Sequence, residues 1–341
     1  MRSSKRILWS LLLLAGCGGN PFVDDGGVTP PPAGTSVSEL TGTAPSSAAG
    51  NVRRSEVKNK GPGGVAVTGN GFAEGYVHDP VNDSFAVDNL AFDGGNVYSR
   101  VGSLNGASVY AGAGQYPDTQ TGVLIDQFTY RALYGTSTSG RSKFAIVRTG
   151  AYAPYGFGGF VYERNGSVVL PTTGQAQYTG TYSGLRDFNG RGGLQLTTGD
   201  MTMEIDFNDF NAAESATGNG AGIAGYVSNR RIYSLNGTDI TAATLAEINV
   251  DKSLVTNPLT ALPTLVFTVG PGVLDNNGEV QGALDSTFVN DTGQVEVLDA
   301  GMYYGVISGT NADEVVGVIV VTSEFDGYTA RETGGFILYR P

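Results

Sequence analysis

The stretch MTMEIDFN, Met201–Asn208, alternates apolar and polar side chains along its whole length. Successive side chains of a β-strand point to opposite faces, so one face would carry Met201, Met203, Ile205 and Phe207, and the other Thr202, Glu204, Asp206 and Asn208. We expect the first set to be buried and the second to contact water. The stretch therefore predicts a strand of an antiparallel sheet with one buried face and one solvated face.

Asn-Gly pairs recur along the chain beyond residue 60. This dipeptide is the strongest short signal for a type I′ hairpin turn, because both central positions of that turn need a positive φ. In Phe160–Leu170, FVYERNGSVVL, β-prone residues flank such a pair on both sides. Several pairs are therefore expected at hairpin tips; they are Asn70-Gly71, Asn105-Gly106, Asn165-Gly166, Asn189-Gly190, Asn219-Gly220, Asn236-Gly237 and Asn277-Gly278.

Further strand candidates lie toward the C-terminus, at Leu265–Val269, Met302–Ile307, Glu314–Val321 and Gly335–Tyr339. A short helix is expected at Thr241–Asn249, with Leu245 and Ile248 on its apolar side. From Gln175 onward the pattern gives about eight or nine strands, enough for one antiparallel sheet to close on itself around an interior filled by side chains.

The predicted fold class is all-β. Residues 171–341 are expected to form an eight-stranded antiparallel up-and-down β-barrel, water-soluble and lipocalin-like in shape. Residues 61–170 are strand-rich but less regular, with glycine-heavy stretches such as Gly156–Gly159, and are expected to form a smaller β-rich domain in front of the barrel. The length of 341 residues suits two domains of ordinary size.

Composition excludes several classes of function. The net charge of -12 makes nucleic acid a poor partner, because phosphate binding needs clustered Lys and Arg, and it disfavours a direct electrostatic grip on anionic lipid. The chain has one cysteine, so an internal disulfide and a thiolate zinc cluster are both excluded within it.

The first twenty residues, MRSSKRILWSLLLLAGCGGN, have basic residues, then the apolar run Ile7–Leu14, then small residues. This is the order of a secretory signal peptide, and the run is too short to span a bilayer as a helix. Leu14-Ala-Gly-Cys17 resembles the bacterial lipobox. That resemblance implies residues 1–16 as a lipoprotein signal peptide, cleavage between Gly16 and Cys17, and lipidation of Cys17 by a diacylglycerol anchor and palmitate.

Residues 17–60 are rich in Gly, Pro, Ser and Thr, include Pro30-Pro31-Pro32, and show no sustained apolar periodicity. We expect them to form a disordered tether between a lipid anchor and the folded part. Aspartate directly after a lipidated cysteine commonly signals retention in the inner membrane, and this position is Gly18. The expected location is therefore the outer membrane, on its periplasmic face or at the cell surface.

The C-terminal half resembles the β-barrel of transferrin-binding protein B and related surface lipoproteins. The segments that carry the resemblance are Tyr178–Tyr182, Met203–Phe207 after Gly199-Asp200, Gly222–Gly225 and Asn311–Val318. The resemblance implies small β domains and eight-stranded barrels outside the outer membrane, which bind host iron or haem proteins. No ligand-contacting residue of that family matches a position here, so transferrin itself is not implied as the ligand.

Candidate catalytic and metal-binding residues are few. His78, the sole histidine, excludes a multi-histidine metal site and is the single residue able to act as base of a Ser-His-Asp triad. It precedes Asp79-Pro80, so we interpret it as a loop histidine without function at a strand end or turn. Glu204 and Asp206 share a strand face as a paired-carboxylate candidate, but alternation on a solvated face explains them more simply.

Two further motifs are interpreted as turns. Asp275–Glu279 concentrates oxygen donors suited to calcium, yet lacks EF-hand spacing. Gly218–Gly222 has no following helix to hold a phosphate. A group of aromatic residues could form either a ligand-binding surface or part of an ordinary core, and both interpretations remain open. These residues are Tyr152, Tyr155, Phe157, Phe160 and Tyr162.

The predicted function is that of a monomeric, non-enzymatic binding lipoprotein of the outer membrane, without cofactor or metal, for an iron- or haem-related ligand or another solute or protein. A structural or assembly lipoprotein of the cell envelope is the alternative. A third hypothesis is an integral outer-membrane barrel, with apolar stretches such as Val315–Val321 facing lipid. The lipobox and the final Arg340-Pro341 argue against it.

Overall fold

A computed structural model describes most of the chain, in which nearly all the regular structure is β. The described residues are 35–36, 47–56, 75–88, 97–118, 120–151, 157–208, 222–269 and 273–341.

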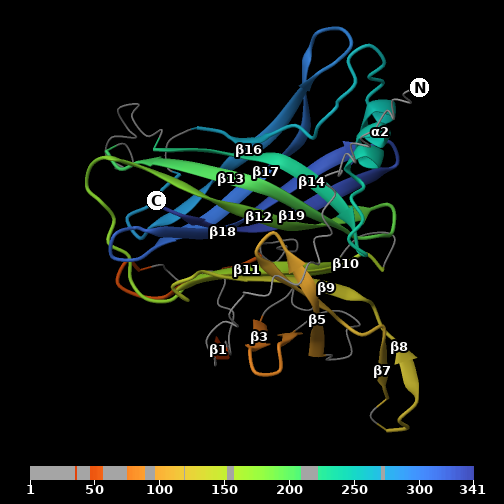
Figure 1. Ribbon diagram of the computed structural model, residues 1–341, viewed down its shortest axis with the longest axis horizontal. Coiled ribbons are helices and arrows are strands. Elements are labelled where there is room, and N and C mark those ends of the chain that lie inside the picture. The colour runs from red at the N-terminus through yellow and green to blue at the C-terminus, as the bar shows by residue number, and fades with distance from the viewer. Residues whose placement is uncertain are drawn as a thin grey trace, which may run out of the picture.

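The C-terminal half is a closed eight-stranded barrel, as the sequence predicts. Its strands follow one another in chain order, each neighbour is antiparallel, and the first pairs with the last, so the sheet closes without an edge (Figure 1). They are β12 (Gln175–Asn189), β13 (Gln195–Asp206), β14 (Ile223–Ser234), β15 (Leu265–Phe267), β16 (Glu279–Val289), β17 (Val295–Ser308), β18 (Glu314–Phe325) and β19 (Tyr328–Tyr339).

The alternation of Met201–Asn208 sets the two faces of β13 as predicted. Met201, Met203 and Ile205 are buried in the barrel core, whereas Glu204 is exposed. Aromatic side chains fill much of the remaining interior, and the rings of Phe267 and Tyr303 stack with their centroids 3.8 Å apart. The barrel is therefore a packed core rather than a channel.

The barrel has one short strand. β15 pairs through two residues with β14 and through two residues with β16, whereas β12 and β13 share a ladder along nearly their whole length. Between β14 and β15 lies helix α2 (Thr241–Asp251), which buries Leu245 and Ile248 at one end of the barrel (Figure 1). The predicted helix and its apolar side are both confirmed.

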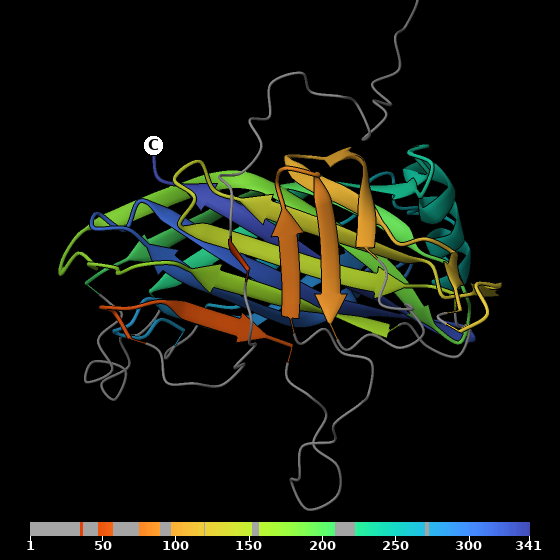
Figure 2. The same cartoon turned by 90° about the horizontal axis from the view of Figure 1, so that it is seen from below.

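A second, nine-stranded sheet covers one side of the barrel. Strands β9 to β11 lie against the barrel, and β3 to β5 run across their far side (Figures 1 and 2). In spatial order the strands are β1 (Thr35–Ser36), β3 (Gly75–Asp79), β4 (Ser84–Asp88), β5 (Val97–Leu104), β6 (Ala107–Ala111), β9 (Tyr130–Thr136), β10 (Ser142–Thr149), β11 (Phe157–Arg164) and β2 (Val52–Ser55). A separate hairpin of β7 (Gln115–Pro117) and β8 (Leu124–Asp126) projects from the body (Figure 1).

The nine-stranded sheet includes residues from the segment expected to be a tether. β2 pairs with β11 in antiparallel register, and its Val52 is 2% exposed within the core that the sheet shares with the barrel. The sheet thus includes Thr35–Ser36 and Val52–Ser55, both ahead of residue 61. A four-residue strand with the sequence VRRS has too little alternation to stand out from a Gly- and Ser-rich background.

The barrel and the sheet share one hydrophobic core. On β18, Val315 and Ile319 point into the barrel, while Val316 and Val318 point outward and are buried beneath the sheet. A strand covered on both faces needs an unbroken apolar sequence, which is why Glu314 is followed by such a run. The outward Val316 and Val318 of this run are covered by protein, which corrects the hypothesis that the stretch Val315–Val321 faces lipid.

The Asn-Gly pairs have mixed outcomes. Asn105-Gly106 forms the tip of the β5–β6 hairpin with φ values of 47° and 92°, as predicted for a type I′ turn. The hairpin predicted around Asn165-Gly166 is wrong, because after β11 the chain leaves the sheet and Val168 bridges to Gly309 in parallel. Asn70-Gly71 and Asn219-Gly220 lie outside the described residues.

Candidate functional site

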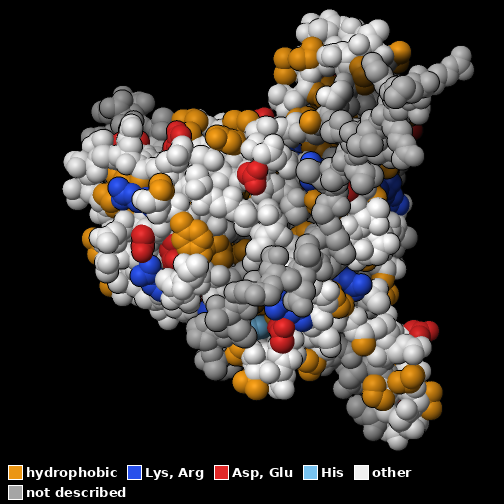
Figure 3. All heavy atoms as spheres, in the orientation of Figure 1, with side chains coloured by type: hydrophobic (Ala, Val, Ile, Leu, Met, Phe, Trp, Pro, Cys, Tyr) orange, Lys and Arg blue, Asp and Glu red, His pale blue; other side chains and the backbone are white. Residues whose placement is uncertain are grey.

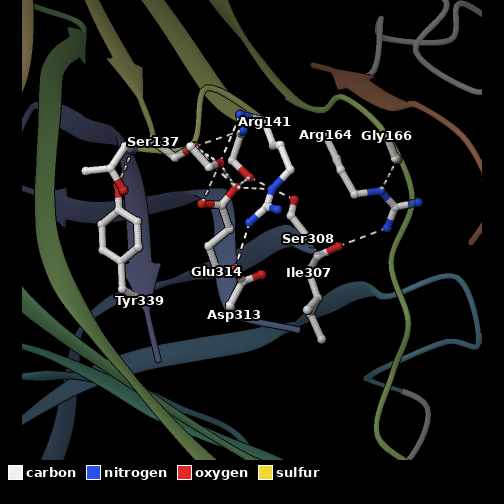
Figure 4. Close-up of polar contacts among 12 residues, drawn as sticks. Ser137, Arg141, Arg164, Gly166, Ile307, Ser308, Asp313, Glu314 and Tyr339 are labelled. Atoms are coloured by element: carbon white, nitrogen blue, oxygen red, sulfur yellow. Dashed lines mark hydrogen bonds and ion pairs between the residues drawn. The ribbon is translucent and has the colours of Figure 1, made fainter. Parts of the chain in front are cut away.

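A polar cluster fixes the sheet to one end of the barrel (Figure 4). Glu314, at the start of β18, is 2% exposed and accepts hydrogen bonds from the hydroxyls of Ser139 and Ser142, each at 2.8 Å. Beside it, Arg141 and Asp313 form an ion pair of 2.8 Å. Because Ser139 and Arg141 belong to the β9–β10 turn and Ser142 begins β10, these bonds tie the sheet to the barrel.

A second tie is the fully buried guanidinium of Arg164, at the end of β11. It donates hydrogen bonds to backbone carbonyls of both layers: to Ile307 at 2.9 Å (Figure 4), to Asn277 at 2.9 Å and to Ser47 at 2.6 Å. Burial lowers the pKa of this guanidinium from its usual value. Arg164 therefore holds the turn at residues 275–279 in a fixed place relative to β11.

Next to these ties, where the covering sheet ends, lies a groove of about 640 Å³. Its floor is the outer face of β16 to β18. Along β18 the outward side chains change from buried Val318, through half-buried Val320, to exposed Thr322. On β17, Tyr304 is half-buried and Met302 is 37% exposed. The apolar stripe that anchors the sheet thus continues past the edge of the sheet into the groove.

The wall of the groove comes from the last strands of the sheet. Phe160 and Tyr162 of β11 are buried in the shared core and also line the groove. The ring of Phe160 stacks on that of Tyr304, with centroids 6.2 Å apart, so the wall and the floor meet through aromatic contact. Ser55 and Glu56 complete the wall at the edge of the sheet.

Ion pairs stand at the rim of the groove. The guanidinium of Arg54 lies 2.8 Å from the carboxylate of Glu279. Glu56 pairs with Arg331 and lies 3.2 Å from the buried guanidinium of Arg148. The pairs Arg54–Glu279 and Arg331–Glu56 join the sheet to the barrel, and the contact between Glu56 and Arg148 lies within the sheet. These charges therefore hold the layers together at the opening of the groove.

His78 lies near the end of β3, in agreement with the expected strand end, but its side chain is buried in the sheet, which corrects its interpretation as a loop histidine. It belongs to β3, is 6% exposed and stacks on Tyr134 with ring centroids 4.5 Å apart. Its Nε2 lies 2.9 Å from the hydroxyl of Tyr110, which donates a hydrogen bond of 2.8 Å to Asp83. Burial lowers the pKa of His78, and Asp83 opposes this shift. The imidazole is part of an aromatic core on the side of the sheet away from the barrel.

The carboxylate candidates each have a local structural role. Gln177 donates to Glu204 at 3.0 Å and Gln175 to Asp206 at 2.6 Å across the outer face of the barrel. The hydrogen bond from Gln175 lowers the pKa of Asp206. The carboxylate of Asp275 accepts the backbone N–H groups of residues 277 and 279 at 2.8 Å each, so Asp275–Glu279 is a turn, as interpreted. Among the described residues, no group of three or more His, Cys, Asp or Glu side chains is placed to hold a metal ion.

Several other predicted residues lie outside the described part of the chain. These are Gly16 and Cys17, Gly218 to Ala221, Tyr152, Tyr155 and the side chain of Phe157. In the described residues no helix has the length and apolar character needed to cross a membrane.

The sequence pointed to Phe160 and Tyr162 but missed their partners in the groove, above all Met302 and Tyr304. The strand Met302–Ile307 was predicted, and its alternation marks Met302 and Tyr304 as sharing a face. That this face meets β11 depends on long-range packing, which no local pattern shows.

Comparisons with known proteins give structural likeness alone. No protein-family model matches the chain, and no curated protein matches its sequence. A mutant transferrin binding protein B from Haemophilus parasuis is similar over 76% of this chain and 43% of its own, with 14% identity and a TM-score of 0.35. Transferrin binding protein B from Neisseria meningitidis is similar over 67% of this chain and 35% of its own, with 14% identity and a TM-score of 0.31. The chain spans less than half the length of these proteins.

Proposed function

We propose that the protein is a non-enzymatic binding lipoprotein, anchored to the outer membrane through Cys17, and that the groove between sheet and barrel is its ligand site. The observation that carries this proposal is the groove itself. Its volume of about 640 Å³ falls in the range of sites that hold small ligands, roughly 300–1,000 Å³. Its walls belong to two layers joined by a common core, so the site is preformed.

The chemistry of the groove supports binding rather than catalysis. Its carboxylates at positions 56 and 279 are engaged by guanidinium groups, and that of Asp275 caps a turn. A general acid or base needs a titrating group within reach of substrate and a pKa matched to its task. The groove offers instead an apolar floor, aromatic rings and fixed ion pairs, which suit recognition.

The anchor is supported by the lipobox resemblance at residues 14–17. Two or three acyl chains hold a lipoprotein stably on a membrane, whereas one chain binds marginally. We expect mass spectrometry of the mature protein to find an acylated N-terminal Cys17, and Cys17→Ser to release the protein from the membrane fraction. A wild-type N-terminus without fatty acid would contradict the anchor.

The ligand site is tested with a soluble form that starts after Cys17. We expect a ligand that raises the thermal unfolding temperature of the wild-type form to lose this effect in Met302→Trp, because a bulky ring at a half-open position of the floor fills the groove. Val297→Trp, on the same strand but away from the groove and 55% exposed, is the matched control. Equal stabilisation of both variants would place the ligand elsewhere.

The β7–β8 hairpin favours the second candidate function, a structural or assembly lipoprotein of the envelope. Its residues Val123, Leu124 and Ile125 are 65%, 59% and 45% exposed, and hydrophobic side chains gather at this tip (Figure 3). Three consecutive exposed apolar residues are unusual on a soluble protein unless they contact a partner. Leu124→Asp should then weaken association with the cell envelope after Cys17 has been replaced, while leaving groove binding intact.

A further inference from the structure

The lining of the groove divides into an apolar stripe and an uncharged polar border. The stripe consists of Met302, Val320, Tyr304 and Phe160. On either side of it lie side chains that carry hydrogen-bonding groups without charge, namely Ser55, Gln281 and Thr322. Gln281 and Thr322 are exposed and Ser55 is half-buried, so all three face the space that a ligand would occupy or its entrance.

The charged groups of the lining are already engaged within the protein. Arg54 is held by both carboxylate oxygens of Glu279, at 2.8 Å and 2.9 Å, and Arg331 is held by Glu56. The carboxylate of Asp275 accepts two backbone N–H groups. Arg54 and Glu279 are each about one-fifth exposed, so their pair is only partly screened by water. An ionic ligand would have to compete with a formed ion pair, which lowers its affinity.

The apolar stripe offers contact area for a ligand, whereas the charged side chains of the lining are already paired within the protein. We therefore propose that the groove selects an uncharged amphipathic ligand, with an apolar or aromatic body and neutral hydrogen-bonding groups at its edge. This inference rests on the proposed function, in which the groove is the ligand site. The body lies on Met302 and Val320 beside Tyr304, and the neutral polar groups reach Gln281 or Thr322. Methionine suits such a floor, since its flexible thioether adapts to different shapes.

Two fluorescent dyes with the same aromatic frame test this selection. N-phenyl-1-naphthylamine is neutral, and 8-anilino-1-naphthalenesulfonate carries one additional sulfonate. In the soluble form we expect the neutral dye to bind at least about tenfold more tightly than the anionic dye, a ratio that corresponds to about 1.4 kcal/mol. Measurements at 0.15 M salt, where the Debye length is about 8 Å, limit the general repulsion of anions by this acidic protein, whose full chain has a net charge of -12.

Two variants and a matched control identify the site and the cause of the selection. Met302→Trp should abolish binding of the neutral dye, while Val297→Trp should retain it. Glu279→Gln removes the carboxylate that holds Arg54, so it should raise the affinity for the anionic dye about tenfold and leave that for the neutral dye within about twofold. Far-ultraviolet circular dichroism checks that each variant keeps the wild-type fold.

The outcomes separate the two proposals. If both dyes bind the wild type equally and Met302→Trp abolishes both, the selection of uncharged ligands is overturned while the groove remains a ligand site. An anionic dye that gains nothing from Glu279→Gln likewise overturns the role of the ion pair in that selection. If neither dye binds, or if Met302→Trp and Val297→Trp bind equally well, the groove is not the site, and the proposed function fails together with this inference.

Discussion

A carboxylate at the junction of the two layers is surrounded by hydroxyl donors rather than by water. Glu314 accepts hydrogen bonds from Ser137 and Ser139 of the β9–β10 turn and from Ser142 at the start of β10, and it lies 3.5 Å from the guanidinium of Arg141. Buried charge needs such partners, because an unpaired carboxylate in the interior is strongly unfavourable. Glu314 therefore stabilises the junction only as long as its donors are in place.

The first prediction removes this carboxylate. Glu314→Ala removes the acceptor of the buried Ser137 and Ser142 hydroxyls and leaves Arg141 with Asp313 alone, so we expect the free energy of unfolding to fall by about 3 kcal/mol. Urea denaturation measures this change. The control is Glu204→Ala, on the solvated face of β13, which should alter stability by less than about 0.5 kcal/mol. Equal effects of the two substitutions would contradict the role assigned to Glu314.

The second prediction concerns pH and the only histidine. The pKa of His78 is lowered by burial from an ordinary value of about 6.5, with Lys143 and Arg100 acting in the same direction and Asp83 and Asp79 opposing. As the pH falls below about 6.5, the unfolded chain takes up a proton at His78 before the folded chain does, so stability is present above this pH and is lost on acidification.

We expect His78→Gln to weaken this dependence. Urea denaturation of wild type at pH 7.5 and pH 5.5 should show lower stability at pH 5.5, and the variant should show a smaller difference between the two. Since the chain has one histidine, the change in slope reports His78 alone. The predicted sign would be contradicted if the wild type were more stable at pH 5.5 than at pH 7.5, with the same difference between the two pH values as in the variant.

At the scale of elements, β18 shows how one strand joins two layers. Its inward residue Val315 belongs to the barrel core, and its outward residue Val316 belongs to the core shared with the sheet; both are 0% exposed. An ordinary barrel strand has one buried face, so its outward substitutions are mild. β18 is buried on both faces and should be sensitive on both.

The third prediction compares three valines. Val315→Ala and Val316→Ala should each lower the free energy of unfolding by about 1.5–3 kcal/mol, because each leaves a cavity in a packed core. Val297→Ala, in the exposed part of β17, should change it by less than about 0.5 kcal/mol. If Val316→Ala proved as mild as Val297→Ala, the sheet would not cover β18 in solution.

Local sequence patterns predicted the strands and the helix of this molecule better than they predicted which elements pack against one another. The alternation at Met201–Asn208 and the helix at Thr241 depend on near neighbours along the chain, so the sequence alone was enough to place them. The pairing of Val52–Ser55 with β11 depends on contacts between distant segments, and the turn at Asn165-Gly166 leads away from the sheet because Val168 bridges to the barrel. The groove is missed for the same reason, since Phe160 and Met302 come from different layers.

At the scale of the whole molecule, the two layers are expected to unfold together. The core between them combines Phe144 and Phe160 of the sheet with Leu185, Leu196 and Val316 of the barrel. Domains that share a large apolar interface do not move or unfold independently of each other.

The fourth prediction tests this by separation. Residues 171–341 produced alone would expose the apolar face that the sheet covers, including Val316 and Val318, and we expect this fragment to self-associate or to remain insoluble. The full soluble form should unfold in a single transition with the same midpoint by circular dichroism and by tyrosine fluorescence. A stable monomeric fragment, seen by analytical ultracentrifugation, would argue for independent domains.

The short strand β15 affects where the barrel opens locally. The ladder between β14 and β15 joins only Tyr226 and Val227 to Val266 and Leu265, so few hydrogen bonds must be lost to part the ring there. Because β15 stays paired with β16 and β12 with β19, the parted barrel would stay one curved sheet running from β15 round to β14. Deuterium should therefore replace the amide protons of this seam sooner than those of β18, and the interior of the ring should first become accessible to water from this side.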